Sequence, residues 1–313
     1  MCEADADITV VGHTDDMTVR PDIVLEMLHD LRTSQYRPSA WVRFAVQSWR
    51  TSQQTAQARP RLVRSWRRAV LGLTLAEAAI FMAEARTGGD EDLRVARRAA
   101  PGAAICLVYT LTDAYVHLGM NNEARGAPLL DTVGLPTVLT LTRCMVTGIL
   151  FGHLLGGVPA RRSLTQLALA AASITDVADG YLARKLHRTT RLGAYLDSEA
   201  DFGAGIAVSL TLLARRSLPA WLVAGMLARW AAPFAYTLAC YFGQGSRVRI
   251  GSTFPGKVAG VAQTVTLGMA LLPDHVVRRV SGLRRALQVV TAVLLIAAPI
   301  SQFARTRGGS SLG

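Results

Sequence analysis

The chain has 313 residues, of which half are hydrophobic and only 18% are charged, and its mean hydropathy is +0.27. About a quarter of the residues of a soluble domain are charged, so this composition excludes an ordinary soluble enzyme and favours a membrane protein. The net charge is +12, yet no nucleic-acid motif accompanies it. We therefore predict that the basic residues face lipid head groups and phosphate-bearing substrates, with no nucleic-acid partner.

The first 68 residues form a polar, basic segment that contains ten arginines. Basic residues accumulate on the cytoplasmic side of membrane proteins, so we predict that residues 1–68 are a cytoplasmic N-terminal tail. Within this tail, residues 37–50 (RPSAWVRFAVQSWR) mix aromatic and basic side chains. That mixture is typical of a helix that rests on a membrane surface, and a marginal helix or a disordered tail is the alternative interpretation.

Two apolar segments follow within residues 69–130. Residues 101–120 are apolar enough to span a membrane, with Asp113 and His117 embedded. These two side chains are four residues apart and face one another on a helix, so we expect a structural contact rather than a proton-handling pair. Residues 69–85 are shorter and carry Glu77 and Glu84, which we expect to face protein or head groups. This segment either spans or lies along the surface, and spanning would keep the tail cytoplasmic.

Six further apolar segments lie in residues 131–313, and a spanning helix needs about 20 mostly apolar residues. They are residues 133–155, 163–178, 193–213, 219–242, 254–272 and 287–303. We therefore predict an all-α polytopic membrane protein, in which a six-helix bundle follows one or two additional N-terminal helices. The predicted parts are a basic tail (1–68), extra hydrophobic helices (69–130) and a membrane catalytic domain (131–313).

Four aspartates flank the turn between the second and third of these six segments. Asp176 and Asp179 are three residues apart, and Asp197 and Asp201 are four apart, so each pair lies on one face of its helix. The short basic turn between the pairs lets the two helices fold back antiparallel, which would bring the four carboxylates together at one membrane edge. Glu199 lies on a different helix face, and we leave it out of this group.

Four acidic side chains in a membrane domain are costly without a partner. A charge at the bilayer centre costs a few kcal/mol or more, and neighbouring carboxylates repel one another. A divalent cation removes both costs, and Mg²⁺ and Mn²⁺ prefer carboxylate oxygens, often together with substrate phosphates. The aspartates therefore predict a Mg²⁺ or Mn²⁺ site and phosphate chemistry.

Small residues and one arginine accompany the aspartates. Gly180 follows the second aspartate and Gly193 begins the next helix, and a missing Cβ lets a ligand or a neighbouring backbone approach closely. Ala183 lies three residues after Gly180, on nearly the same face. The planar guanidinium of Arg184 is well suited to a diphosphate.

The complete pattern resembles the signature of the CDP-alcohol phosphatidyltransferases, with every signature position filled. It reads Asp176-x2-Asp179-Gly180-x2-Ala183-Arg184-x8-Gly193-x3-Asp197-x3-Asp201. Eight fixed positions would match by chance on the order of once in a billion windows. The resemblance extends over residues 133–303, and residues 1–130 depart from the minimal family plan.

Shorter matches support the same resemblance. They are Thr137, Thr140 and Arg143 in the first helix, Arg229 in the fourth, and Gly256 with Lys257 at the start of the fifth.

The resemblance implies an enzyme of phospholipid biosynthesis that transfers a phosphatidyl group from CDP-diacylglycerol, or a similar CDP-alcohol, to an alcohol and releases CMP. We expect all four aspartates, Asp176, Asp179, Asp197 and Asp201, to belong to the metal site. The resemblance implies that the first three hold the metal and that Asp201 is the general base toward the acceptor hydroxyl. The implied donor-binding residues are Asp176, Asp179, Gly180, Ala183, Arg184, Gly193 and Thr140. The resemblance also implies a homodimer, and we expect a multi-pass protein of the plasma membrane with its active site facing the cytoplasm.

Four basic residues are candidates for acceptor binding, namely Arg229, Arg247, Arg249 and Lys257. Such a cluster suits a phosphorylated polyol such as glycerol 3-phosphate or inositol phosphate, although anchoring to lipid head groups would use the same charges. A cardiolipin-type synthase with a lipid acceptor is one alternative. An ion-coupled membrane transporter is the alternative from another class, and it explains buried carboxylates but neither the two glycines nor Arg184.

Overall fold

The chain folds into a bundle of helices. The computed structural model describes residues 23–87, 89–123, 127–185, 189–240, 242 and 253–308, and every regular element among them is helical. The elements are α1 (Ile23–Thr33), α2 (Pro38–Ala58), α3 (Pro60–Thr87), α4 (Asp90–Val116), the 3₁₀ turn η1 (Leu118–Met120), α5 (Leu135–Leu155), α6 (Arg162–Lys185), α7 (Arg191–Ala214), α8 (Ala220–Ala239), α9 (Phe254–Ala270), α10 (Asp274–Arg279) and α11 (Ser281–Gly308). The predicted all-α class is confirmed.

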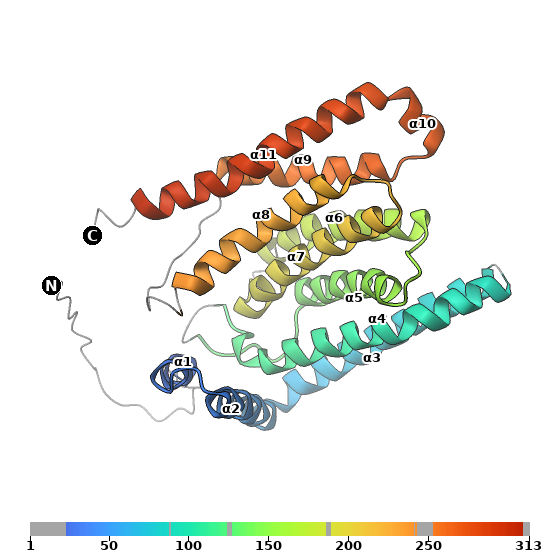
Figure 1. Cartoon of the computed structure of the whole chain (residues 1–313). Helices are drawn as coiled ribbons and strands as arrows, with labels where there is room; N and C mark the ends of the chain where they lie inside the picture. The colour runs from blue at the N-terminus through green and yellow to red at the C-terminus, as the bar shows by residue number, and fades with distance from the viewer. Residues whose placement is uncertain are drawn as a thin grey trace.

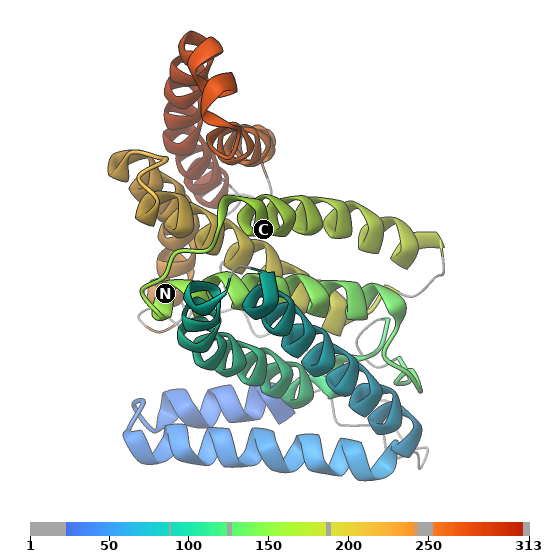
Figure 2. The ribbon, with the colours of Figure 1, turned by 90° about the vertical axis from the view of Figure 1, so that its right-hand side faces the viewer.

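The long helices run side by side, whereas the first two lie across one end of them. In Figure 1, α1 and α2 are seen end-on while α3 and α4 cross the view; in Figure 2, α1 and α2 are seen along their length. The predicted helix in residues 37–50 is present as part of α2. That this helix rests on a membrane surface stays a prediction.

Length and apolar composition alone qualify four of the described helices to cross a membrane: α4, α5, α8 and residues 281–301 of α11. Helices also form at the other predicted spans, but α6 and α7 carry the aspartates and α9 has only 17 residues. Crossing by these three and by α3 stays a prediction. The described helices establish a polytopic membrane protein.

The predicted span at 101–120 was wrong in its limits. Helix α4 begins at Asp90 and ends at Val116, with Pro101 inside it. The apolar run by which we placed the span begins at Pro101, whereas the helix begins eleven residues earlier. Three acidic residues, Asp90, Glu91 and Asp92, instead form the first turn, where negative charge is favourable at the helix N-terminus.

Helices α4 and α5 pack closely through small residues. Glycines recur every four residues, at 148 and 152 in α5 and at its C-cap, 156. A Cβ on Gly152 would lie 2.5 Å from the Ala99 carbonyl oxygen and 2.7 Å from the Ala103 Cβ. Small residues at such spacing let membrane helices approach, so the N-terminal helices are part of the bundle. The three-part domain division stays a prediction, and α3 runs continuously across its boundary at residue 68.

Helix α7 lies between two apolar cores. One core contains Leu192 and Leu196 of α7 together with residues of α3, α4 and α5. The other contains Val208 and Leu212 of α7 together with residues of α8, α9 and α11. This central position fixes the direction in which the α7 side chains point. Glu77 is buried and Glu84 lies 3.3 Å from the His153 Nε2, so the expectation that these acids face protein is met.

Candidate active site

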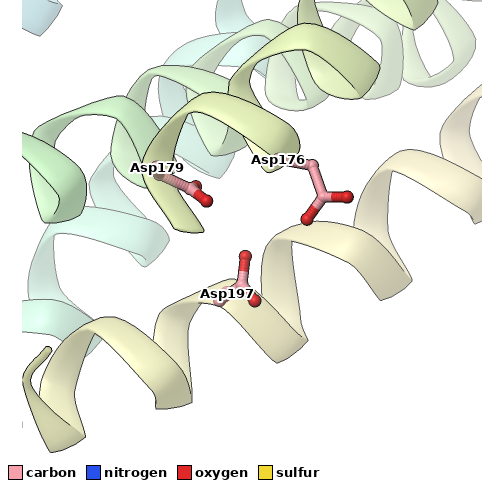
Figure 3. A group of neighbouring side chains, drawn as sticks. All are labelled: Asp176, Asp179 and Asp197. Atoms are coloured by element: carbon pink, nitrogen blue, oxygen red, sulfur yellow. The ribbon is translucent and has the colours of Figure 1, made fainter. Parts of the chain in front are cut away.

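The aspartates of α6 and α7 face each other across the two helices. Asp176, Asp179 and Asp197 each offer a carboxylate oxygen, and these oxygens all lie within 4.8 Å of one another. Figure 3 shows the two α6 carboxylates directed toward that of α7. Spacing along the helices and the antiparallel turn therefore produce the convergence that a metal site requires.

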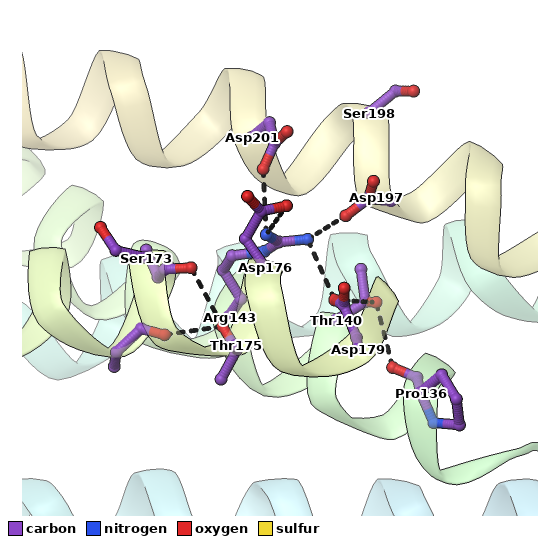
Figure 4. A network of polar contacts seen from close by, with 12 residues as sticks. Pro136, Thr140, Arg143, Ser173, Thr175, Asp176, Asp179, Asp197, Ser198 and Asp201 are labelled. Carbon is purple, nitrogen blue, oxygen red and sulfur yellow. Dashed lines mark hydrogen bonds and ion pairs between the residues drawn. The ribbon is translucent and has the colours of Figure 1, made fainter. Parts of the chain in front are cut away.

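A buried arginine from α5 lies at the centre of this group. The Arg143 side chain is 1% exposed, and its Nη1 lies 3.2 Å from Asp176 and 3.0 Å from Asp201. Its Nη2 lies 3.4 Å from Asp179 and also pairs with Asp197. Figure 4 shows one guanidinium joined to all four aspartates. Asp201 thus belongs to the same charge network, although it lies outside the three mutually close carboxylates.

The four carboxylates differ in their access to a ligand. The Asp179 side chain is only 9% exposed, and its Oδ2 accepts a hydrogen bond from the Thr140 hydroxyl at 3.1 Å. The side chains of Asp176, Asp197 and Asp201 are between 40% and 51% exposed. One aspartate is therefore fixed by α5, and the other three have oxygens that a substrate or cation can reach.

The charge balance of the site fits a bound cation. Four carboxylates face one guanidinium, which leaves a formal excess of three negative charges. Carboxylate oxygens are the ligands that hard divalent ions prefer. Asp176, Asp179 and Asp197 are therefore the residues suited to hold Mg²⁺ or Mn²⁺.

A pocket of about 300 Å³ opens beside the aspartates. Its lining is Pro136, Thr137, Thr140, Asp179, Gly180, Thr189, Thr190, Gly193, Ala194 and Asp197. The lining contains four of the seven residues expected to bind the donor, and a fifth, Asp176, belongs to the adjoining group of carboxylates. Ala183 and Arg184 belong to α6, but their side chains lie outside the described part of the structure.

Gly193 has a specific steric role at this pocket. The Thr190 hydroxyl caps α7 by accepting a hydrogen bond from the Gly193 amide at 3.0 Å. A Cβ on Gly193 would lie 3.1 Å from that hydroxyl oxygen and 3.4 Å from the hydroxyl oxygen of Thr137. A side chain there would therefore crowd both the helix cap and the pocket wall.

The proposed acceptor residues are only partly described. Arg229 donates hydrogen bonds to the Gln263 Oε1 at 3.1 Å and to the Gly256 carbonyl oxygen at 2.9 Å, so it joins α8 to α9. Lys257 is exposed next to Gly256. Arg247 and Arg249 lie outside the described residues, so their convergence with Arg229 and Lys257 stays a prediction.

A second polar group occupies another face of α7. The Tyr195 hydroxyl lies 2.9 Å from Glu199 and 3.2 Å from Asp113, and the His117 Nδ1 lies 3.3 Å from Asp113. The predicted contact between Asp113 and His117 is present. Glu199 lies away from the metal face, as we expected, and it links α7 to α4.

Sequence reasoning included Arg143 in a family pattern but gave it no role. A signal for that role was present, because Arg143 is the sole charged residue of the apolar segment 133–155. An ionisable residue inside a membrane segment is by default functional and faces a partner. What the sequence could not show is that one guanidinium reaches four carboxylates on two other helices.

Comparisons with known proteins agree with this site. A family model described as CDP-alcohol phosphatidyltransferase matches residues 133–299, more than half of the chain. A relative from Salmonella choleraesuis, named CDP-diacylglycerol–glycerol-3-phosphate 3-phosphatidyltransferase, is 28% identical over 186 residues, which cover 56% of this chain and 95% of the relative. The protein of that name from Escherichia coli K12 is 31% identical over 176 residues, which cover 52% and 88%. No solved structure matches the chain.

Proposed function

We propose that this chain, which belongs to the CDP-alcohol phosphatidyltransferase family, transfers a phosphatidyl group from CDP-diacylglycerol to glycerol 3-phosphate and releases CMP. The observation that carries the proposal is the group of four aspartates around Arg143, next to a pocket formed by the same helices. The choice of glycerol 3-phosphate rests on the names of the Salmonella and Escherichia coli relatives. A membrane transferase of phospholipid biosynthesis is the broader statement that family membership establishes.

Asp176, Asp179 and Asp197 would hold the divalent metal, and Asp201 completes the acidic group. A bound Mg²⁺ or Mn²⁺ would neutralise the diphosphate of the donor and stabilise CMP as the leaving group. The chain itself supplies the preorganisation: Thr140 fixes Asp179, and Arg143 orients all four carboxylates before substrate arrives. Preorganised charges of this kind lower the barrier because they need no rearrangement during the reaction.

The pocket beside Asp179 and Asp197 would take the cytidine diphosphate part of the donor. Gly180 and Gly193 leave room there for close approach, and Thr137 and Thr140 provide hydroxyl groups on the α5 side. We assign Ala183 and Arg184 to the same donor pocket from the family pattern. The acyl chains would extend between the helices into the lipid.

Asp201 would act as the general base toward the acceptor hydroxyl. Its side chain is 43% exposed and lies one helical turn beyond Asp197, so an alcohol can reach it. Arg143 contacts one of its oxygens at 3.0 Å, which positions the carboxylate for the attack. The acceptor phosphate would bind the basic residues Arg229, Arg247, Arg249 and Lys257.

We also propose that the protein is a homodimer in the plasma membrane and that its aspartates face the cytoplasm. The basic start of α3 lies at the same end of the bundle as the start of α5, because the Ser65 hydroxyl accepts a hydrogen bond from the Val133 amide at 3.1 Å. The start of α7 joins the same end, because the Arg191 amide donates a hydrogen bond to the Asn122 carbonyl oxygen at 2.9 Å. This arrangement supports a common side of the membrane for the basic start of α3 and the aspartates.

The direct test is CMP release by the purified full-length protein in detergent. We expect CMP from CDP-diacylglycerol only when glycerol 3-phosphate and Mn²⁺ or Mg²⁺ are both present, and no CMP with EDTA. Inositol phosphate and phosphatidylglycerol, offered in parallel, test the other acceptor classes. CMP release with phosphatidylglycerol but not with glycerol 3-phosphate would instead establish a lipid acceptor, and no release with any alcohol would refute the transferase proposal.

A further inference from the structure

A pocket of about 660 Å³ lies inside the corner between α2 and α3. The two helices meet at Arg59, a single non-helical residue before Pro60, and a residue that precedes proline disfavours the helical conformation. The corner pocket is lined by Gln53, Ala56, Gln57, Val63, Trp66, Arg67, Val70, Leu71, Thr74 and Tyr115. None of these residues belongs to α6 or α7, so the corner pocket is separate from the aspartate site.

The lining combines one basic residue with polar and apolar side chains. Arg67 of α3 faces the pocket together with Gln53 and Gln57 of α2, and Val70 and Leu71 lie about one turn further along α3. These α3 residues form one face of the helix, because they are spaced by three and four positions. A mixed lining of this kind suits an amphipathic ligand with one charged end.

The net positive charge of the residues around the corner favours a ligand with a negatively charged group. Residues 38–76 contain seven arginines and no aspartate or glutamate. Asp131 approaches Arg59 and Arg61 at 3.7 and 3.8 Å. In the part of the chain that the structure describes, Arg67 has no such carboxylate partner. An anion supplied from outside the chain is the complement that this guanidinium lacks.

The corner pocket also opens toward apolar surroundings. Leu71 is 60% exposed, and so is Leu75 one turn later. On α2, Trp41 and Trp49 are both more than two-fifths exposed, and tryptophan is enriched where protein meets the membrane–water interface. A pocket that places Arg67 beside the apolar side chains of α3 therefore matches the boundary between the head-group and acyl regions of a lipid layer.

We propose that the corner between α2 and α3 binds one anionic phospholipid of the surrounding membrane. The lipid phosphate lies at Arg67 with Gln53 and Gln57, and the upper part of an acyl chain lies along Val70 and Leu71. Basic clusters beside membrane helices attract anionic lipids generally. In addition to this general attraction, the pocket provides a specific site, which Arg67 lines and the neighbouring Arg68 does not.

That difference provides a matched pair of variants. Arg67 lines the pocket, and the neighbouring Arg68 is exposed but does not line it. The assay is titration of the full-length protein in detergent with dioleoylphosphatidylglycerol, followed by native mass spectrometry, with dioleoylphosphatidylcholine as the uncharged comparison. We expect Arg67→Gln to weaken the affinity for the anionic lipid about five-fold, from the contribution of one interfacial arginine. Arg68→Gln changes it by less than about two-fold on the same scale.

A third variant tests the cavity rather than the charge. Ala56→Phe fills the corner pocket without removing an arginine, and we expect it also to weaken binding of the anionic lipid. Equal unfolding temperatures of all three variants in phosphatidylcholine show that the fold is retained. Equal losses for Arg67→Gln and Arg68→Gln would mean diffuse attraction to the basic surface and would overturn the proposal, as would unchanged binding by Ala56→Phe.

Discussion

Helix α7 carries acidic residues on two faces, and the acidic side chains on the two faces have different partners. On one face, Asp197 and Asp201 join Asp176 and Asp179 around the single guanidinium of Arg143. On the other, Glu199 meets only one further acid, Asp113, across the Tyr195 hydroxyl. Among the described residues, the first face has four carboxylates and one guanidinium, whereas the second has two carboxylates that contact one hydroxyl and the imidazole of His117.

This comparison identifies which acidic cluster is built for a ligand. Buried charges are tolerated only when they are paired or hydrogen-bonded. Among the described residues, the aspartate face has three more negative than positive formal charges. On the Tyr195 face, the tyrosine hydroxyl and the His117 imidazole contact the two carboxylates and join α7 to α4. We therefore expect changes on the aspartate face to affect metal and turnover, and changes on the Tyr195 face to affect stability.

The largest effect is expected for Arg143→Gln. It removes the buried cation and leaves four carboxylates facing one another, and breaking a buried charge pair typically costs about 3–5 kcal/mol. We expect a strongly lowered unfolding temperature in detergent, which Mn²⁺ partly restores by supplying positive charge. Arg143→Lys keeps the positive charge but not the two guanidinium nitrogens that contact the carboxylates, so its unfolding temperature should fall less than that of Arg143→Gln. Equal unfolding temperatures for Arg143→Gln and the wild type would show that the carboxylates do not depend on this arginine.

A matched pair on α7 tests the two faces directly. Asp197→Asn removes a carboxylate from the proposed metal group, and we expect CMP release to fall at least about 100-fold, as for loss of a preorganised electrostatic group. Glu199→Gln, two residues away on the other face, should change CMP release by no more than about five-fold, the effect of a single ordinary hydrogen bond. Rates are measured with saturating Mn²⁺ and again across a Mn²⁺ titration. If the two variants lose activity equally, the distinction between the faces fails.

The sequence predicted the acidic group well because its cause is local. Spacings of three and four residues place Asp176 and Asp179 on one face of α6, and Asp197 and Asp201 on one face of α7, however the helices pack. The central role of Arg143 depends on how α5 packs against α6 and α7, which no spacing within α5 reveals. The start of α4 was misplaced because the apolar run from Pro101 marks only part of the helix, whose first turns are charged.

Tyr195→Phe should have a moderate effect, and on stability more than on activity. It removes the hydroxyl hydrogen-bonded to Asp113 and Glu199, and a buried acceptor that loses its partner costs about 1–3 kcal/mol. We expect a lower unfolding temperature and an unchanged Mn²⁺ midpoint for CMP release. Tyr109→Phe, on an exposed position of α4, is the control and should behave as the wild type. A shifted Mn²⁺ midpoint in Tyr195→Phe would show that the Tyr195 face and the aspartate face of α7 are energetically coupled.

The smallest effect is expected at His117, at the C-terminal end of α4. Burial lowers the pKa of this imidazole, but the hydrogen bonds and charge of Asp113 and the charge of Glu199 raise it by more, so the pKa lies above its ordinary value of 6.5. A raised pKa in the folded state means that His117 stabilises the fold fully below the unfolded pKa, and that this contribution is lost as pH rises through the folded pKa. We therefore expect His117→Gln to be less stable than the wild type at pH 6, by up to about 1 kcal/mol, with the difference shrinking toward alkaline pH. Unfolding temperatures measured across this range check the sign, and a difference that grows with pH would mean that the Asp113 carboxylate does not favour the charged imidazole.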